Sequence, residues 1–260
     1  MNLWVMLLEQ NLDYININNN SNNDILNFIL CYPVSNNELF NQRLQELKNL
    51  GIEYLELSGP TILFGNHILG KGTRGLVVKA FSKNQAYALK IRRLDSPRHN
   101  LSKEAKIQSF VNSLGIGPKI VDSSKNFIIM ELIQGKLLSQ LYDMESLNVD
   151  IIRLTIKSLM DQCYRLDING VDHGELSDLR KHVIINHRVN IIDFDSASYN
   201  RKTSNLTSCI QYLFIGGPNS EFLRKLFEID LDKILLLLRK YKFNKDYLTY
   251  VHLLKLLNMN

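Results

Sequence analysis

The chain has 260 residues, of which 45% are hydrophobic and 22% are charged. This composition excludes a disordered chain, a collagen-like chain and a coiled coil, and the length predicts one domain of two lobes or two small domains that share a cleft. Lysine and arginine number 31 against 26 aspartates and glutamates, a net charge of +5. That excess favours anionic partners such as a nucleotide, a phosphoprotein or RNA, although a solvated basic surface explains it equally well.

Cysteine use and hydropathy favour a cytoplasmic protein. Cys31, Cys163 and Cys209 are widely separated, which is typical of buried thiols in a reducing compartment. No apolar run approaches the roughly 20 residues that a membrane helix needs, and the apolar start of the chain, Met1 to Leu8, lacks the flanking features of a secretory signal. We therefore expect no membrane association.

The first half of the chain predicts one helix followed by short antiparallel strands. The first 35 residues show no clear pattern, and the Asn-rich stretch at 18–23 favours a loop. Ser35 and Glu38 fit a capping box, and apolar residues then recur at helical spacing until Gly51. The expected later elements are strands at 52–57, 61–64, 77–81 and 86–92, a helix at 102–114, and strands at 119–122 and 126–132.

The second half is predicted to be mainly helical. A long helix is expected over 149–169, and two short β runs at 183–185 and 189–192 predict a hairpin. The helices expected after the hairpin are 205–214, 221–227, 231–241 and 247–257. A small sheet-rich half followed by a larger helical half predicts an α+β fold.

A glycine-rich run, Gly70-Lys71-Gly72-Thr73-Arg74-Gly75, is the first motif that indicates chemistry. In a dinucleotide-binding fold such a run precedes a helix. Here residues 76–81 continue as a strand, so we expect the glycines at a hairpin tip, where backbone N–H groups can approach phosphate oxygens. Val77 stands where a valine would pack on an adenine ring.

A lysine follows within an apolar strand, in the run Tyr87-Ala88-Leu89-Lys90. An unpaired buried ammonium is costly, so Lys90 must reach solvent or an anionic partner. Glu104 on the next predicted helix is such a partner, and the ion pair would hold Lys90 towards nucleotide phosphates. The alternative is an edge-strand lysine beside a surface glutamate.

These motifs and two later ones, His173-Gly174-Glu175 and Asp193-Phe194-Asp195, occur in the order of the protein-kinase motifs. Over residues 61–215 the sequence resembles the protein-kinase-like superfamily, and it looks closest to the small atypical archaeal Ser/Thr kinases related to the RIO kinases and to the kinase of the tRNA-threonylcarbamoyl complex. The resemblance implies a bilobal kinase-like fold, with a small antiparallel-sheet N-lobe at 51–132 and a helical C-lobe at 133–260. An N-terminal extension at 1–50, with one amphipathic helix, would act as an adaptor or cover the small lobe.

The resemblance also implies roles for individual residues. Asp193 corresponds to the metal-binding aspartate that holds Mg²⁺ or Mn²⁺ against ATP. Glu175 replaces the catalytic aspartate and would accept the proton of the substrate hydroxyl, with Asp178 as the alternative. Met130 would gate the back pocket, and the backbone of residues 131–133 would bind the adenine edge. The ATP-binding residues implied in this way are Gly70, Gly72, Gly75, Val77, Ala88, Lys90, Glu104, Met130, Glu131 and Leu132.

The second metal ligand has two candidates. Counting from Glu175 without gaps puts Arg180 in the place of the usual asparagine. Aligning the strand at 183–185 with the corresponding strand of kinases puts His182 there instead. We prefer His182, because strands tolerate insertions less than loops. Neither side chain suits Mg²⁺, so we expect one ion held chiefly by Asp193, use of Mn²⁺, or direct action of both residues on phosphate. His173 is expected to be structural, holding its loop by a hydrogen bond.

The segment after Asp195 is short, because residues 196–204 alone precede the next predicted helix. A long activation loop has no room there, so regulation by loop phosphorylation and docking of an extended peptide are not expected. Asp195 itself stands where protein kinases usually have glycine, a change also found in small-molecule kinases of this superfamily. Basic residues could form a rim for an anionic substrate or RNA, or be solvated; they are Arg180, Lys181, Arg188, Arg201 and Lys202.

We therefore expect an ATP-dependent phosphotransferase, an atypical Ser/Thr protein kinase that transfers the γ-phosphate to a hydroxyl, including one of its own. Its catalytic residues would be Lys90, Glu175 and Asp193, with a metal ion held by Asp193 and His182. Asp195 and the short segment favour the alternative of a small-molecule kinase. Glu175 and the missing asparagine favour a weakly active ATP-binding module in a protein or RNA complex.

Overall fold

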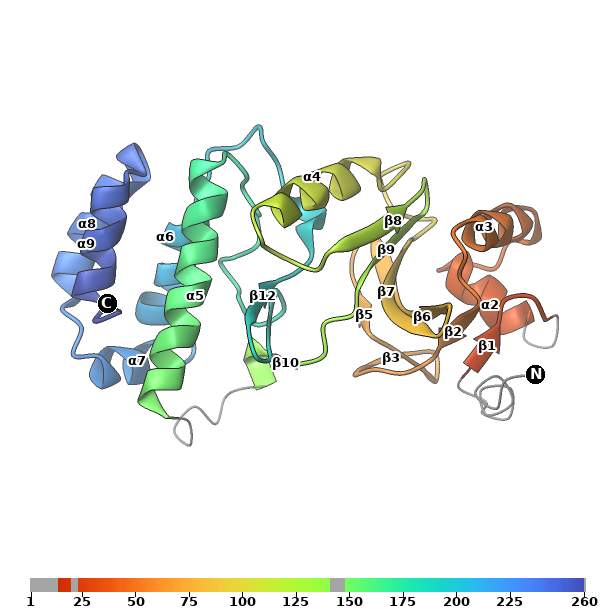
Figure 1. Cartoon of the computed structure of the whole chain (residues 1–260), viewed down its shortest axis with the longest axis horizontal. Helices are drawn as coiled ribbons and strands as arrows, with labels where there is room; N and C mark the ends of the chain where they lie inside the picture. The colour runs from red at the N-terminus through yellow and green to blue at the C-terminus, as the bar shows by residue number, and fades with distance from the viewer. Residues whose placement is uncertain (1–13, 20–22, 141–147, 260) are drawn as a thin grey trace. The chain divides into compact units, whose positions relative to one another are not determined.

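The computed structural model describes residues 14–19, 23–140 and 148–259, which form an α+β fold (Figure 1). The chain divides into two compact units. The first contains the described residues up to Ser109 together with Pro118–Leu132, and the second contains Phe110–Gly117 and the described residues from Ile133 onwards.

The first unit is built on an antiparallel sheet. Its seven described strands have the order β1-β2-β6-β7-β9-β8, with β5 paired to β6. These strands are β1 Tyr14–Asn16, β2 Tyr54–Glu56, β5 Gly70–Lys71, β6 Gly75–Ser82, β7 Gln85–Arg92, β8 Ile120–Ser123 and β9 Phe127–Glu131. A separate two-stranded ribbon is formed by β3 Thr61–Leu63 and β4 Asn66–Ile68.

One face of this sheet is covered by two helices, α2 (Asn23–Leu30) and α3 (Asn37–Asn49) (Figure 1). Alternate sheet residues such as Leu76, Val78 and Leu89 join the buried side chains of the two helices in one hydrophobic core. Each large apolar side chain buried there stabilises the fold by about 1.5–3 kcal/mol. Because side chains of a strand alternate between faces, the residues between them project to the opposite face.

Buried polar contacts also tie α3 to the sheet. Arg43 is only 2% exposed, and its guanidinium donates hydrogen bonds to the carbonyls of Leu30 and Arg92 and to Oδ1 of Asn126. The carboxylate of Glu46 accepts from the backbone N–H and side-chain amide of Asn126, at 2.8 and 2.6 Å. The described part of the N-terminal extension therefore forms a structural cover on the sheet.

Two details of this region differ from the sequence-based expectation. Asn36 rather than Ser35 caps α3, because its Oδ1 accepts the N–H of Leu39 at 2.9 Å. The extension also contains α2 and β1 in addition to the expected helix. Helix α2 has eight residues, too few turns for a helical repeat to stand out in the sequence.

The second unit is mainly helical. Its described helices are α5 Val149–Ile168, α6 Asn205–Gln211, α7 Ser220–Leu226, α8 Leu231–Asn244 and α9 Tyr247–Leu256. Helix α6 continues as a π-helical turn at Tyr212–Gly216, and α4 (Ser102–Ser113) includes residues of both units. No helix of the described residues is both long and apolar enough to cross a membrane.

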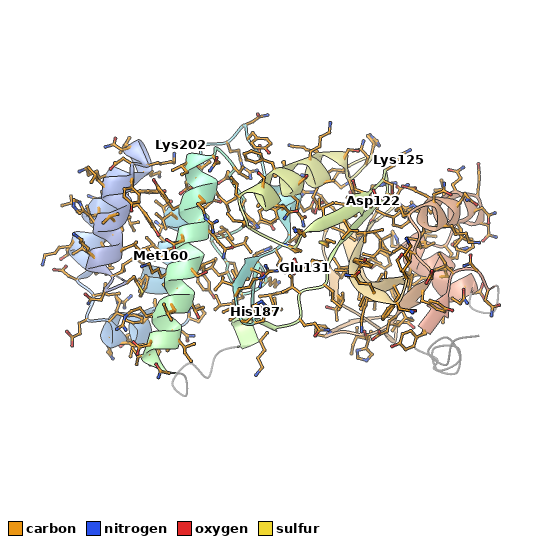
Figure 2. All side chains as sticks on the ribbon, viewed as in Figure 1. Asp122, Lys125, Glu131, Met160, His187 and Lys202 are labelled. Atoms are coloured by element: carbon orange, nitrogen blue, oxygen red, sulfur yellow. The ribbon has the colours of Figure 1, made fainter. Side chains whose placement is uncertain are left out.

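A small sheet completes the second unit. Its order is β10 (Lys136–Leu137), β11 (Val183–Ile185) and β12 (Val189–Ile191), all antiparallel, with a 3-10 turn at Leu138–Gln140 after β10. His187 lies in the turn between β11 and β12, and Met160 lies on α5 (Figure 2). The long helix and the hairpin expected from periodicity are thus confirmed, and β10 is an addition.

Candidate functional site

The glycine run forms a hairpin in the first unit. Strand β5 pairs with β6 so that Gly70 lies opposite Val77, and the N–H of Gly72 donates to the carbonyl of Gly75 at 2.8 Å. Of the three glycines, Gly75 is the most crowded, because a Cβ there would lie 3.0 Å from Cε of Lys90. A Cβ on Gly72 would meet nothing closer than 3.6 Å. The expected hairpin tip is therefore present, and its last glycine leaves room for Lys90.

Lys90 and Glu104 form the ion pair that the sequence predicts. Nζ of Lys90 lies 2.6 Å from Oε1 of Glu104, and the side chains are only 7% and 1% exposed. In the sheet, Lys90 lies directly opposite Val77 on β6 and Ile128 on β9. Directly opposite residues project to one face, which here is the face not covered by α2 and α3. The pair is thus buried beside an apolar surface formed by Val77 and its neighbours.

The expected adenine-binding segment lies at the end of β9. Met130 is opposite Ala88 in the sheet, and both side chains are buried. The N–H of Glu131, labelled in Figure 2, donates to the carbonyl of Lys119 at 2.8 Å. That N–H is therefore committed to the protein, so an adenine contact by Glu131 would have to use its carbonyl.

Three side chains of the second unit lie close together: Glu175, His182 and Asp193. One donor atom from each lies within 4.8 Å of the others. The hairpin explains part of this arrangement, because Val183 pairs with Ile191 and the N–H of Ile192 donates to the carbonyl of His182 at 2.9 Å. The residue before β11 and the residues after β12 are thereby placed side by side. We call these three residues the carboxylate–histidine cluster.

Glu175 makes two contacts within this region. Its Oε2 lies 3.4 Å from Nε2 of His182, and its Oε1 accepts a hydrogen bond from Oγ of Ser196 at 2.8 Å. The side chain of Glu175 is 39% exposed, so solvent reaches it. Ser196 is the last residue of the 3-10 turn Phe194–Ser196, which follows Asp193. The backbone of Asp193 has a φ of 65°, a left-handed conformation that aspartate tolerates better than most residues do. Asp195 in the same turn is buried.

The two alternative candidates, Asp178 and Arg180, bind each other instead. Nε and Nη2 of Arg180 donate to the two carboxylate oxygens of Asp178 at 2.8 and 2.7 Å. These hydrogen bonds lower the pKa of Asp178 to about 2, so this carboxylate is a poor proton acceptor. Of the two pairs of alternatives, Glu175 and His182 are thus the ones whose donor atoms lie beside that of Asp193.

His173 is buried beneath the cluster. Its Nε2 lies 3.0 Å from the carbonyl of Ile192, and its ring lies 5.0 Å from that of Phe194 and 5.4 Å from that of His182. Burial, with a smaller contribution from His182, lowers the pKa of His173 to about 4. The ring is neutral at pH 7, so Nε2 carries a proton and donates it to the carbonyl. The expected structural role is confirmed.

Comparison with known proteins places the chain beside an archaeal relative. No family model matches the chain. The chain is 32% identical to the uncharacterized protein MJ1211 of Methanocaldococcus jannaschii over 105 residues. These residues make up 40% of this chain and 89% of that protein. The chain belongs to the same family as this protein.

Sequence reasoning missed the residues that hold the loop of His173 and Glu175. Asn205, at the start of α6, is 1% exposed. Its Oδ1 accepts the N–H of His173 at 2.9 Å, and its amide donates to the carbonyl of Val171 and to Asp167 at 2.7 and 2.8 Å. In the sequence, Asn205 looks like a residue at an ordinary helix start, and no local signal indicates that its partner lies 32 residues away.

Arg201 is the second missed contributor, since it was expected on a basic rim. Its Nε donates to the carboxylate of Asp172 at 2.8 Å, and its Nη2 donates to the carbonyl of Ser196 at 2.6 Å. A Cβ on Gly174, whose φ is 89°, would collide with this guanidinium. Nζ of Lys202, labelled in Figure 2, lies 5.1 Å from the ring centre of Phe243.

Three of the five residues expected on a basic rim are therefore engaged within the protein. Arg180 and Arg201 are engaged with carboxylates, and Lys202 lies over an aromatic ring. Charges that are already paired within the protein contribute little attraction for an external anion.

Proposed function

We propose that the chain is an ATP-dependent phosphotransferase of the atypical protein-kinase type, which transfers the γ-phosphate to a serine or threonine hydroxyl. One observation carries this proposal: Glu175, His182 and Asp193 converge to within 4.8 Å around the β11–β12 hairpin. A proton acceptor and a metal-binding carboxylate at such a hairpin are the groups that phosphoryl transfer requires. The order of a sheet-rich unit and a helical unit is compatible with this family of enzymes.

The first unit would contribute phosphate binding. The buried carboxylate of Glu104 fixes the ammonium of Lys90 at 2.6 Å, so that a positive charge is already positioned for phosphate oxygens. The glycine hairpin at 70–75 would bring backbone N–H groups to the phosphates with few side chains in the way, apart from the N–H of Gly72, which is bound to the carbonyl of Gly75. Val77 and Ala88 would contribute apolar surface for the adenine ring.

The second unit would contribute the metal ion and the proton acceptor. Asp193 and His182 would hold a divalent ion, which neutralises charge on the phosphates when bound. Glu175 would accept the proton of the attacking hydroxyl. Its Oε1 already accepts one hydroxyl at 2.8 Å, within the reach of a general base.

The donor set fits a divalent cation, but it does not favour magnesium. The carboxylate of Asp193 suits any hard cation, whereas the imidazole of His182 suits Mn²⁺ or Zn²⁺ better than Mg²⁺, which prefers oxygen ligands. We therefore propose Mn²⁺ as the preferred ion. The proposed partners are ATP and a protein that carries the hydroxyl. An RNA or ribonucleoprotein partner remains a proposal, although two of the five basic residues that suggested it, Arg180 and Arg201, are engaged with carboxylates.

The direct test measures transfer of labelled phosphate from ATP by the full chain and by its Asp193→Ala variant, with Mg²⁺ and with Mn²⁺. We expect the variant to lose transfer. Asp178→Asn is the matched control, because that carboxylate lies nearby but is bound to Arg180, and it should keep transfer. Transfer by Asp193→Ala at the wild-type rate would refute the proposal.

The acceptor is tested by offering proteins, amino acids and sugars side by side. Preferred labelling of a protein supports the proposed protein kinase, and preferred labelling of a sugar or amino acid indicates a small-molecule kinase. ATP binding without transfer under either metal would instead identify a nucleotide-binding module.

A further inference from the structure

We propose that Ser196 is a phosphoacceptor of the chain itself, modified within the same molecule. This inference rests on the proposed phosphotransferase function and adds an acceptor to it. The observation that carries it is the hydrogen bond from Oγ of Ser196 to Oε1 of Glu175, 2.8 Å long. A hydroxyl at this distance from a carboxylate base is in the position that an acceptor hydroxyl takes before proton transfer.

The metal-binding carboxylate is also near. Asp193 immediately precedes the turn Phe194–Ser196, and its carboxylate lies within 4.8 Å of the donor atom of Glu175. A phosphate group held at Asp193 would therefore be close to both the base and the hydroxyl of Ser196. All three residues belong to the second unit.

The backbone around Ser196 is held on both sides. Its carbonyl accepts a hydrogen bond from Nη2 of Arg201 at 2.6 Å, and the N–H of Ala197 donates to the carbonyl of Phe194 at 3.0 Å. Two residues further on, Ser198 and Asp172 exchange backbone hydrogen bonds of 2.9 and 3.0 Å. A hydroxyl fixed in this way loses little entropy on reaching an attacking geometry, which is the main advantage of an intramolecular acceptor.

The chemical step needs ATP as its co-reactant. Oγ of Ser196 forms a bond to the γ-phosphorus, and the bond from this phosphorus to the oxygen that bridges to the β-phosphorus breaks. The products are phosphoserine and ADP. The hydroxyl proton passes to Glu175 and from there to solvent, so atoms and charge balance.

The product would limit further reaction. A phosphoserine carries a charge of about −1.5 to −2 at pH 7, and it would lie beside the carboxylates of Glu175 and Asp193. Like charges repel at this distance, so a modified chain should bind a second ATP more weakly. The short segment after Asp195 is consistent with this arrangement, because no long loop is needed to bring the hydroxyl to the base.

The test incubates the full chain with γ-labelled ATP and either Mn²⁺ or Mg²⁺, with and without an added protein acceptor, and measures consumed ATP and labelled peptides in the same reaction. We expect label on Ser196, with an initial rate per chain that does not change on hundredfold dilution of the protein. Ser196→Thr should give phosphothreonine at the same position, and Ser196→Ala should lose this label. The matched control is Ser177→Ala, an exposed serine of the same loop, which should keep it.

The possible failures are distinguishable. If ATP is consumed or an added protein is labelled while Ser196 stays unlabelled, self-modification is overturned and the proposed function stands; Ser196 would then only orient Glu175. A rate per chain that rises with protein concentration overturns modification within one molecule. If no ATP is consumed with either metal, both proposals fall together.

Discussion

Nζ of Lys90 lies 2.6 Å from Oε1 of Glu104, and both side chains are almost fully buried. Removing one charge of a buried pair leaves the other in a low-dielectric environment, which costs about 3–5 kcal/mol. Glu104→Gln should therefore lower the free energy of unfolding by about that amount, as measured by urea denaturation. Lys90→Met combined with Glu104→Gln should recover much of the loss, because two neutral side chains leave no charge uncompensated.

An exposed pair provides the control for this prediction. Lys225 and Glu221 lie 2.8 Å apart on the surface of α7, where water screens both charges. Glu221→Gln should leave the unfolding curve unchanged. A double variant as unstable as Glu104→Gln alone would show that the loss arises from packing and not from the ammonium deprived of the Glu104 charge.

The glycine hairpin supports a second prediction, which separates two glycines of one motif. A Cβ at Gly75 would press on Cε of Lys90 at 3.0 Å and on the carbonyl of Ile91 at 3.1 Å, whereas a Cβ at Gly72 has its nearest neighbour at 3.6 Å. Gly75→Ala should move Lys90 and weaken ATP binding by about tenfold, which corresponds to about 1.4 kcal/mol. Gly72→Ala should weaken ATP binding less than Gly75→Ala does, because its Cβ would not press on Lys90. Equal effects in a titration with ATP would contradict this steric explanation.

Much of the fold could be predicted because local patterns determine it. The β pattern that continues after Gly75 indicated a hairpin rather than a strand–helix turn, and the sheet confirms this. Aligning the strand at 183–185 with its kinase counterpart selects His182, whereas counting residues from Glu175 selects Arg180. In the structure Nε2 of His182 lies 3.4 Å from Glu175, and Arg180 is paired with Asp178. Both inferences needed only short stretches of sequence.

The supporting contacts of the site could not be predicted, because they join distant residues. Asn205 binds the backbone of His173 across 32 positions, and Arg201 binds Asp172 across 29. An arginine among other basic residues is typical of an exposed rim, and nothing local shows that its carboxylate partner is buried. Likewise, Asn36 and Ser35 are equally good caps by residue type, and the backbone geometry decides between them.

The metal preference gives a third prediction. Because His182 offers a nitrogen where magnesium prefers oxygen, the wild-type chain should transfer phosphate faster with Mn²⁺ than with Mg²⁺. His182→Asn replaces that nitrogen by an amide oxygen and should raise the ratio of the Mg²⁺ rate to the Mn²⁺ rate. The matched control is His187→Asn, in the exposed turn of the same hairpin (Figure 2), which should leave the ratio at its wild-type value. An unchanged ratio in His182→Asn would remove His182 from the set of metal ligands.

Asn205 supports the last prediction, which concerns how the loop of Glu175 is held. Its side chain is bonded to the N–H of His173, the carbonyl of Val171 and the carboxylate of Asp167. Leaving a buried polar group without its partner costs about 1–3 kcal/mol, so Asn205→Ala should lower the free energy of unfolding by at least about 3 kcal/mol. Because the loop carries Glu175 and not Lys90, the residue proposed to bind phosphate, kcat should fall more than the affinity for ATP. Urea denaturation and steady-state kinetics measure the two effects.

Asn200→Ala is the control for Asn205→Ala, since Asn200 is exposed and its known bond, to Oγ of Ser198, is made by the backbone N–H. This variant should match the wild type in stability and in kcat. If Asn205→Ala were as stable as Asn200→Ala, solvent would have replaced the three bonds, which requires that the start of α6 opens readily. If Asn205→Ala instead lost ATP affinity while kcat stayed constant, the loop would not position Glu175, and the assignment of that carboxylate as the base would lose its structural support.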